Sequence, residues 1–208
     1  LDFKVSPSSK SIEGSNLIRY EVLSQNQLMQ IDLQPPMKIT SVLENNKSLD
    51  YKRNGNAYYI VLKKNQQIGA INEITIHFEG APKISNNPPW DDGFTWEKDK
   101  NGTDFIATSC QGGGSSIWWP SKDHMYDEPD QGIELSITAP KHLMSVANGR
   151  LIHTKKNSNH TNTSTWKVVN PINNYGVNIN IGDYVHFSEK YKGKKGVLDC
   201  DYYVLSYN

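Results

Sequence analysis

The sequence predicts an all-β fold, either a β-sandwich or an open barrel of antiparallel strands. Aromatic residues, which suit the half-buried surfaces of sheets, make up 10% of the chain, and 11 residues are tyrosines. Apolar and polar side chains alternate along most of the chain, and turn residues separate the alternating runs at intervals of about 8–12 residues. Because no internal repeat or break in composition is present, we expect one domain that spans residues 1–208.

Several runs have the period of two that is typical of strands with one buried and one solvent-facing side. In the run nearest the C-terminus, the side expected to be buried carries Leu198, Cys200, Tyr202 and Val204. No window of a dozen residues has a helical period, and only residues 171–175 are expected to form one helical turn. The runs are residues 29–34, 74–79, 133–138, 177–181 and 198–204.

Glycine-containing turns separate these runs. The pair Asn148-Gly149 is expected to form a hairpin between the segments on either side, because Asn-Gly supplies the two positive φ values of a type I′ turn. Prolines fall outside the alternating runs, where a residue without a backbone donor is tolerated in a sheet protein. The expected turns are Asn54-Gly55, Asn148-Gly149 and Gly193 to Gly196.

Residues 81–129 are the exception, because they show little alternation and contain a glycine triplet and four of the five tryptophans. Long irregular segments in compact domains are usually functional or disordered. This segment is too aromatic for disorder, so we expect an ordered and functional loop region. The four tryptophans are Trp90, Trp96, Trp118 and Trp119.

Charge and hydropathy exclude two classes of partner. Lys plus Arg and Asp plus Glu both number 22, whereas a protein that binds nucleic acid usually has a basic excess or stripe. The one dense basic run, within residues 190–195, is interpreted as a solvated hairpin tip. No apolar run approaches the roughly 20 residues that a membrane helix needs, so we expect no membrane span.

Neither the cysteines nor the start of the chain identifies a compartment. Cys110 and Cys200 do not make a disulfide framework, and they could either pair or stay free. The chain has no initiator Met and no signal peptide, and it opens inside a strand-like pattern, as a trimmed or mature chain would.

No motif of a known catalytic site is present. A zinc peptidase carries His-Glu-x-x-His on a helix, which places two imidazoles on one face with a carboxylate base between them. None of the six histidines has that spacing, and there is no Gly-x-Ser-x-Gly elbow, phosphate-binding loop or Cys-x-x-Cys pair. We therefore assign no catalytic residue and no metal ligand to this chain.

The densest polar cluster has two interpretations. It could be a metal site, with one imidazole and several carboxylates, or a solvated turn whose acids pair with Lys122 and cap backbone amides. The turn is favoured, because a closed zinc site normally has more His or Cys. The cluster consists of Lys122, Asp123, His124, Asp127 and Glu128.

The glycine triplet 112–114 does not fit a phosphate-binding loop, which needs a strand before it and a helix after it. Residues 117–120 read Ile-Trp-Trp-Pro, a poor helix start. The glycines are therefore expected to let the backbone approach a ligand or another domain closely. Next to them, Gln111 offers two amide donors and an acceptor, so it could contact a ligand or only stabilise the loop.

Motifs along nearly the whole chain, in their order and spacing, resemble the N-terminal domain of the aminopeptidase N family of zinc metallopeptidases, which are gluzincins. Residues 1–5 with 12–14 resemble the opening strand pair, and residues 147–151 resemble a later hairpin. The segments that resemble the central signature of the family are Thr108-Ser109-Cys110-Gln111, residues 119–124 and Asp127-Glu128-Pro129. Residues 170–175, 181–184 and 202–205 resemble the closing strands.

The resemblance implies a saddle-shaped β-sandwich that packs over a thermolysin-like catalytic domain. In that family the zinc ligands and the general-base Glu lie downstream of this domain. This chain alone would then be no enzyme and hold no cofactor, while zinc would belong to the catalytic domain of a parent protein that removes N-terminal residues from peptides. Relatives with this pattern are often exported in bacteria, to the periplasm or the cell surface, which leaves the compartment of this chain open.

The resemblance also implies a substrate-binding role within residues 107–129. In the family, a Gln or Glu in a Thr-x-Cys-Gln/Glu context binds the free α-amino group of the substrate. The matching residue is Gln111, and we expect Gly112 and Gly113 to line the same substrate-binding site. The run 112–114 is richer in glycine than in many relatives, so the conformation of the loop stays open.

Two other hypotheses about function remain open. The chain could be a stand-alone β-sandwich module that binds carbohydrate or protein through an exposed, planar row of the four tryptophans named above. The parent protein could also be a pseudo-peptidase or scaffold. If a catalytic domain is the partner, the isolated domain should expose a sizeable apolar face, which would favour a non-physiological dimer of the fragment.

Overall fold

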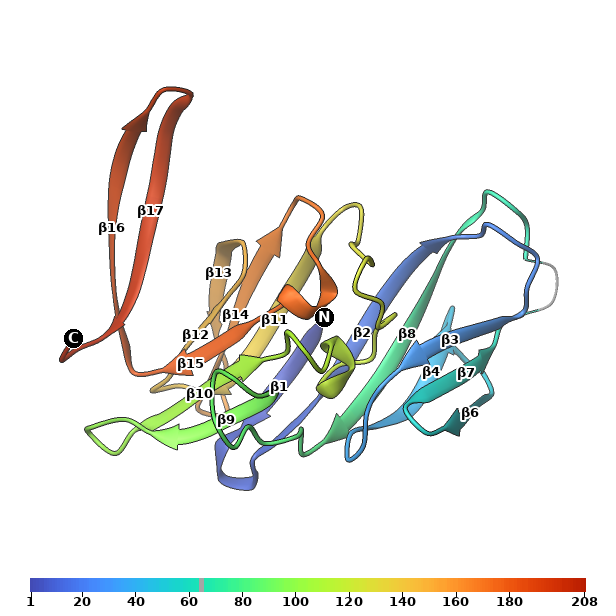
Figure 1. The fold of residues 1–208 in the computed structure, drawn as a ribbon, viewed down its shortest axis with the longest axis horizontal. Coiled ribbons are helices and arrows are strands. Elements are labelled where there is room, and N and C mark those ends of the chain that lie inside the picture. The colour runs from blue at the N-terminus through green and yellow to red at the C-terminus, as the bar shows by residue number, and fades with distance from the viewer. Residues whose placement is uncertain (64–65) are drawn as a thin grey trace.

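The computed structural model describes residues 1–63 and 66–208, and these form an antiparallel β-sandwich (Figure 1). One layer is an eight-stranded sheet. In spatial order its strands are β13 (Arg150–Lys156), β14 (Thr161–Val168), β11 (Ile133–Pro140), β1 (Asp2–Ser6), β2 (Ser11–Glu21), β8 (Ile71–Gly80), β4 (Lys38–Glu44) and β5 (Lys47–Ser48).

The second layer consists of two smaller sheets. One has the order β12 (Met144–Ala147), β15 (Ile179–Gly182), β10 (Asp104–Ser109) and β9 (Gly93–Lys98). The other has the order β3 (Leu28–Asp32), β7 (Ala57–Val61) and β6 (Tyr51–Asn54). The remaining elements are the hairpin of β16 (Tyr184–Gly193) and β17 (Gly196–Leu205) and three 3₁₀ turns, η1 (Pro7–Ser9), η2 (Ser115–Ile117) and η3 (Asn174–Gly176).

The predicted fold class is confirmed. The alternating runs at 29–34, 74–79, 133–138 and 177–181 lie in or overlap β3, β8, β11 and β15, and the expected helical turn overlaps η3. Among the strand pairs of the described residues, only β1 and β11 run parallel, with Phe3 opposite Ile137. No helix in this part of the chain is long and apolar enough to cross a membrane.

The core lies on one face of the eight-stranded sheet. Phe3, Gly14 and Phe78 are paired across β1, β2 and β8 and point to that face. Trp118, which is 0% exposed, packs edge-on against Phe3 with ring centroids 5.3 Å apart and against Phe94 of β9 at 5.9 Å. Trp118 therefore joins the two layers.

The three-stranded sheet packs on the same face. Ile39 of β4 donates its backbone N–H to the Tyr58 hydroxyl at 3.3 Å, and its carbonyl accepts a hydrogen bond from the Tyr51 hydroxyl at 3.2 Å. Ile39 lies opposite Phe78, so both small sheets cover one side of the large one. The buried residues of all three sheets form one continuous hydrophobic cluster.

The predicted hairpin at Asn148-Gly149 is wrong. The two strands it was expected to pair belong to different layers, since β12 pairs with β15 and β13 pairs with β14. Of the two turn residues, Gly149 has a positive φ, of 87°, and Asn148 does not. The Asn148 side chain instead donates to the Gly176 carbonyl at 3.1 Å and accepts from the Asn178 N–H at 2.7 Å, so it fixes a crossing between layers.

The irregular segment is shorter than expected. Residues 93–109 form the hairpin of β9 and β10, in which Phe94 and Trp96 face the core. Residues 110–129 are irregular apart from η2 and a single bridge that pairs Ser121 with Asp32. The alternation of β9 and β10 was not recognised in the sequence, because Gly93 opens the first strand and a polar turn at residues 99–103 separates the two.

The C-terminal hairpin projects away from the sandwich (Figure 1). Its alternation is as predicted, but the side expected to be buried is not covered by the described residues. Phe187, Tyr191 and Leu198 lie on that side and are 51%, 63% and 54% exposed. The basic run forms the hairpin tip, with Gly193 opposite Gly196, as predicted.

We predict that Trp118→Ala lowers the free energy of unfolding by about 3–5 kcal/mol, because it removes the ring that joins the layers and leaves a cavity. Trp90→Ala is the matched control, since Trp90 is 84% exposed, and it should change stability by less than about 0.5 kcal/mol. Urea denaturation followed by circular dichroism measures both. Equal effects would contradict the role assigned to Trp118.

Candidate functional site

The candidate site begins where β10 ends. Cys110 is buried, and its carbonyl accepts the Gly114 N–H at 3.0 Å, which closes a turn over residues 110–114. Gln111 lies on this turn and is exposed. Its side chain makes no hydrogen bond to any residue in the described part of the chain. The amide group is therefore available to a ligand.

Two contacts hold the turn in place. The Gly112 N–H donates to Asp92 Oδ1 at 2.9 Å. Gln34, two residues after β3, donates Nε2 to the Gly113 carbonyl at 2.8 Å and to Ser116 Oγ at 3.0 Å. The backbone beside Gln111 is thus anchored from two directions.

Side chains of this chain occupy the space beside Gly113 and Gly114. A Cβ on Gly113 would lie 2.4 Å from Ile117 Cδ1, and one on Gly114 would lie 2.3 Å from Asp123 Oδ1. Gly114 also has a φ of 86°, which disfavours any other residue. The sequence predicted a close approach to a ligand or another domain, which stays a prediction, whereas the approach found here is to side chains of this chain.

Asp123 organises the segment that follows. Its carboxylate accepts hydrogen bonds from the hydroxyls of Ser115 and Ser116, and Ser115 Oγ lies 2.6 Å from Ser121 Oγ. These three serines are at most 3% exposed. The Asp123 N–H donates to Asp32 Oδ2 at 3.3 Å, which links the cluster to β3.

The polar cluster at residues 122–128 forms a turn. Lys122 Nζ pairs with Asp127 Oδ1 at 3.0 Å. The buried Asn174 donates Nδ2 to the carbonyls of Lys122 at 2.7 Å and of His124 at 3.1 Å. The contacts of Lys122 and Asp123 support the turn interpretation. Among residues 1–63 and 66–208, no group of three or more His, Cys, Asp or Glu could hold a metal ion.

Cys110 is not a nucleophile in this structure. Both cysteines are free. Burial, with smaller contributions from the charges of Asp92 and Asp123, raises the pKa of the Cys110 thiol to about 12. The thiol therefore stays protonated at neutral pH, and only the thiolate is reactive.

A second loop, residues 84–92, lies against the Gln111 turn. Ser109 Oγ donates to the Pro89 carbonyl at 2.8 Å, in addition to the contact between Asp92 and Gly112. Trp90 of this loop is exposed, whereas Trp96, Trp118 and Trp119 are at most 8% exposed. The planar, exposed tryptophan row that a sugar-binding module would need is therefore not formed.

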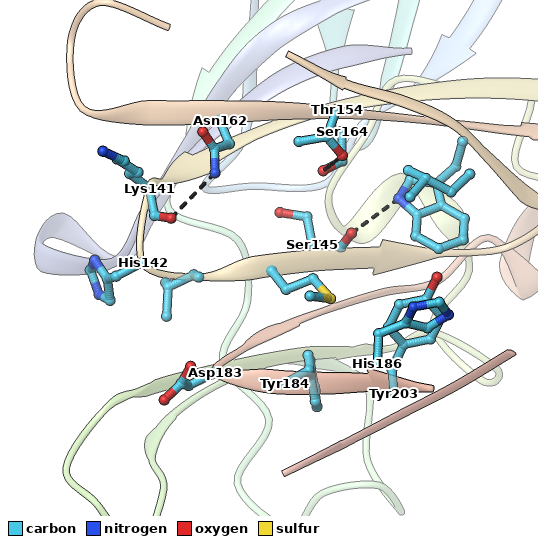
Figure 2. Close-up of a pocket in the computed structure, with 14 residues that line it drawn as sticks. Lys141, His142, Ser145, Thr154, Asn162, Ser164, Asp183, Tyr184, His186 and Tyr203 are labelled. Atoms are coloured by element: carbon cyan, nitrogen blue, oxygen red, sulfur yellow. Dashed lines mark hydrogen bonds between the residues drawn. The ribbon is translucent and has the colours of Figure 1, made fainter. Parts of the chain in front are cut away.

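A groove of about 300 Å³ lies at the base of the C-terminal hairpin (Figure 2). There the His186 ring stacks on Tyr203 at 4.6 Å, and Tyr203 packs edge-on against Trp166 at 5.7 Å. His186 Nε2 lies 2.8 Å from Asp201 Oδ1. Burial raises the pKa of Tyr184, which also lines the groove, to about 12.

Sequence reasoning missed this groove. Its walls come from β12, β13, β14 and the hairpin, and no local motif marks them. Trp166 could have been a signal, because it is the one tryptophan outside the aromatic segment, and its Nε1 donates to the Ser145 carbonyl at 3.0 Å. Figure 2 shows the bond accepted by the Ser145 carbonyl and the one from Asn162 to the Lys141 carbonyl.

No protein-family model and no curated protein matches the chain. Solved structures do match, and they include an M1 zinc metallopeptidase from Deinococcus radiodurans, with 15% identity and a TM-score of 0.78 over 96% of this chain. A mutant of a two-domain M1 zinc metallopeptidase bound to L-arginine matches with 15% identity and a TM-score of 0.79. A mutant from D. radiodurans bound to a Tyr-Ser-Ala substrate matches with 14% identity and a TM-score of 0.78.

These likenesses confirm the predicted resemblance at the level of the fold. In all three cases the match covers 96% of this chain and 45% of the other chain. The chain therefore spans slightly less than half the length of the metallopeptidases it resembles, and its fold corresponds to one part of theirs.

We predict that Asp123→Ala lowers the free energy of unfolding by about 2–4 kcal/mol, because it leaves buried serine hydroxyls without their acceptor. Asp130→Ala is the control, since Asp130 is exposed, and it should change stability by less than about 0.5 kcal/mol. Thermal and urea denaturation measure both variants. A stable Asp123→Ala protein would show that the serines do not depend on this carboxylate.

Proposed function

We propose that the chain is the non-catalytic N-terminal domain of a zinc aminopeptidase, that residues 1–208 form one β domain, and that it helps to bind the substrate α-amino group. The observation that carries this proposal is the fold match to an M1 zinc metallopeptidase, which covers 96% of this chain and 45% of the metallopeptidase chain. The single hydrophobic cluster that runs through all three sheets supports one domain.

Zinc would belong to the rest of the parent protein. The printed sequence has no His-Glu-x-x-His, and two carboxylates of the 122–128 cluster have other partners, since Asp127 pairs with Lys122 and Asp123 accepts from serines. The donor set of this chain does not fit a catalytic zinc. Its own contribution would be to bind and orient substrate beside that centre.

The C-terminal hairpin would dock against the catalytic domain. One side of it carries the exposed Phe187, Tyr191 and Leu198 around Glu189, and the opposite side carries mostly polar residues, which include Ser188 and Lys190. A contiguous apolar face left in water marks an interaction site. The catalytic domain is the occupant that fits, since the hairpin projects from the sandwich (Figure 1) and the fold matches only 45% of the metallopeptidase chain.

Gln111 would bind the α-ammonium group of the peptide. Its carbonyl oxygen can accept one of the three ammonium donors, and the anchored turn fixes where that oxygen lies. A blocked N-terminus lacks those donors, so this contact would select peptides with a free amine. Structures of this fold include complexes with L-arginine and with Tyr-Ser-Ala, which carry free amines, and that supports an amine-binding role.

We predict that Gln111→Ala in the full-length protein raises the KM for aminoacyl substrates about five- to thirtyfold, which corresponds to about 1–2 kcal/mol for the lost hydrogen bond. Gln25→Ala changes the same residue type at another exposed position and should leave KM unchanged. Steady-state kinetics with alanine p-nitroanilide measure both. An unchanged KM for Gln111→Ala would exclude the assignment.

We also predict that Phe187→Asp loosens the contact between the domains of the full-length protein, because it places a charge in the apolar face. Ser188→Asp adds the same charge on the opposite side of the same strand and should have no effect. Calorimetry measures this as a splitting of the unfolding transition in Phe187→Asp only. Identical profiles for the two variants would contradict docking through this face.

A further inference from the structure

One exposed aromatic side chain lies next to the Gln111 turn. Trp90 is 84% exposed, whereas the other four tryptophans are at most 8% exposed. It stands at the end of residues 84–92, the loop that precedes β9. A large ring with this much of its surface exposed is free to contact a ligand.

Hydrogen bonds within the loop support the backbone that carries Trp90. The Asp91 carboxylate accepts hydrogen bonds from the Ser85 hydroxyl and from the N–H groups of Asn86 at 2.7 Å and Asn87 at 2.9 Å. The bond from Ser85, aided by these backbone N–H groups, holds the pKa of Asp91 below its usual range. The Trp90 N–H donates to the Asn87 carbonyl at 2.9 Å, so the backbone that carries the ring is fixed.

The same loop is fastened to the turn that carries Gln111. Asp92, two residues after Trp90, binds the N–H of Gly112, the residue after Gln111. Pro89, the residue before Trp90, accepts from Ser109, two residues before Gln111. Each hydrogen bond lies one or two residues from Trp90 and from Gln111, so the two backbone segments are joined on both sides of these residues.

We propose that Trp90 contacts the side chain of the first residue of the substrate and favours large apolar side chains. The proposal rests on the proposed function of Gln111. The α-amino group and the first side chain leave the same carbon atom, so a group fixed beside the amine-binding amide meets that side chain. An indole face gains from contact with an apolar side chain and gains little from a methyl group.

The test compares kcat/KM for leucine and alanine p-nitroanilide in the full-length protein. Trp90→Ala should lower the leucine-to-alanine ratio about tenfold, the scale on which apolar pockets discriminate side chains. Trp90→Phe should largely keep the ratio, because it retains an aromatic face. Leu23→Ala, at a residue 80% exposed between β2 and β3, is the control and should leave the ratio unchanged.

The outcomes separate this proposal from the one on which it rests. If Gln111→Ala raises KM for both substrates while Trp90→Ala leaves the ratio unchanged, the role of Trp90 is overturned and that of Gln111 stands. If neither substrate is hydrolysed, the proposed activity fails. In that case the fluorescence of Trp90, taken as the difference between the wild-type protein and Trp90→Phe, is quenched with acrylamide. If leucine amide protects this fluorescence and glycine amide does not, the Trp90 contact is supported. If quenching is the same with both amides, the contact is overturned.

Discussion

The hydrogen bonds between the Asp123 carboxylate and the buried serines determine the rest of the site. Ser115 and Ser116 lie in η2, which places Trp118 between the two layers of the sandwich. The same carboxylate occupies the space beside Gly114, so the turn that carries Gln111 is shaped by it. Without that acceptor, the buried hydroxyls of Ser115 and Ser116 would lose a hydrogen-bond partner at the centre of this irregular segment.

Local patterns predicted the strands well and their partners poorly. The period of two located β8 and β11 because it depends only on which side chains face the core. The segment at Asn148-Gly149 was assigned to a hairpin because its residues suit a tight turn, yet the chain there crosses from one layer to the other. The choice of partner is made by residues 28–30 positions away, Gly176 and Asn178, which no local window contains.

The candidate site was predictable only in part. An ordered aromatic segment followed from its composition, and Gln111 was found through the resemblance to a family. The contact between Asp92 and Gly112 joins residues 20 positions apart, and the groove at the hairpin base combines three strands of the sandwich with both strands of the hairpin. Neither feature is marked by a local sequence motif. The apolar side of the C-terminal hairpin was predicted to be buried, because alternation identifies an apolar side of a strand. Alternation does not identify what covers that side.

The parallel pairing of β1 with β11 sets an order of events during synthesis on the ribosome. Phe3 lies beside Ile137, so the first strand cannot complete its place in the sheet until more than 130 further residues have emerged. At about 5–20 residues per second that wait is roughly 7–27 s. During this interval β1 can pair with β2, as an early hairpin whose other edge is open, and this nascent edge is where a chaperone would be most useful.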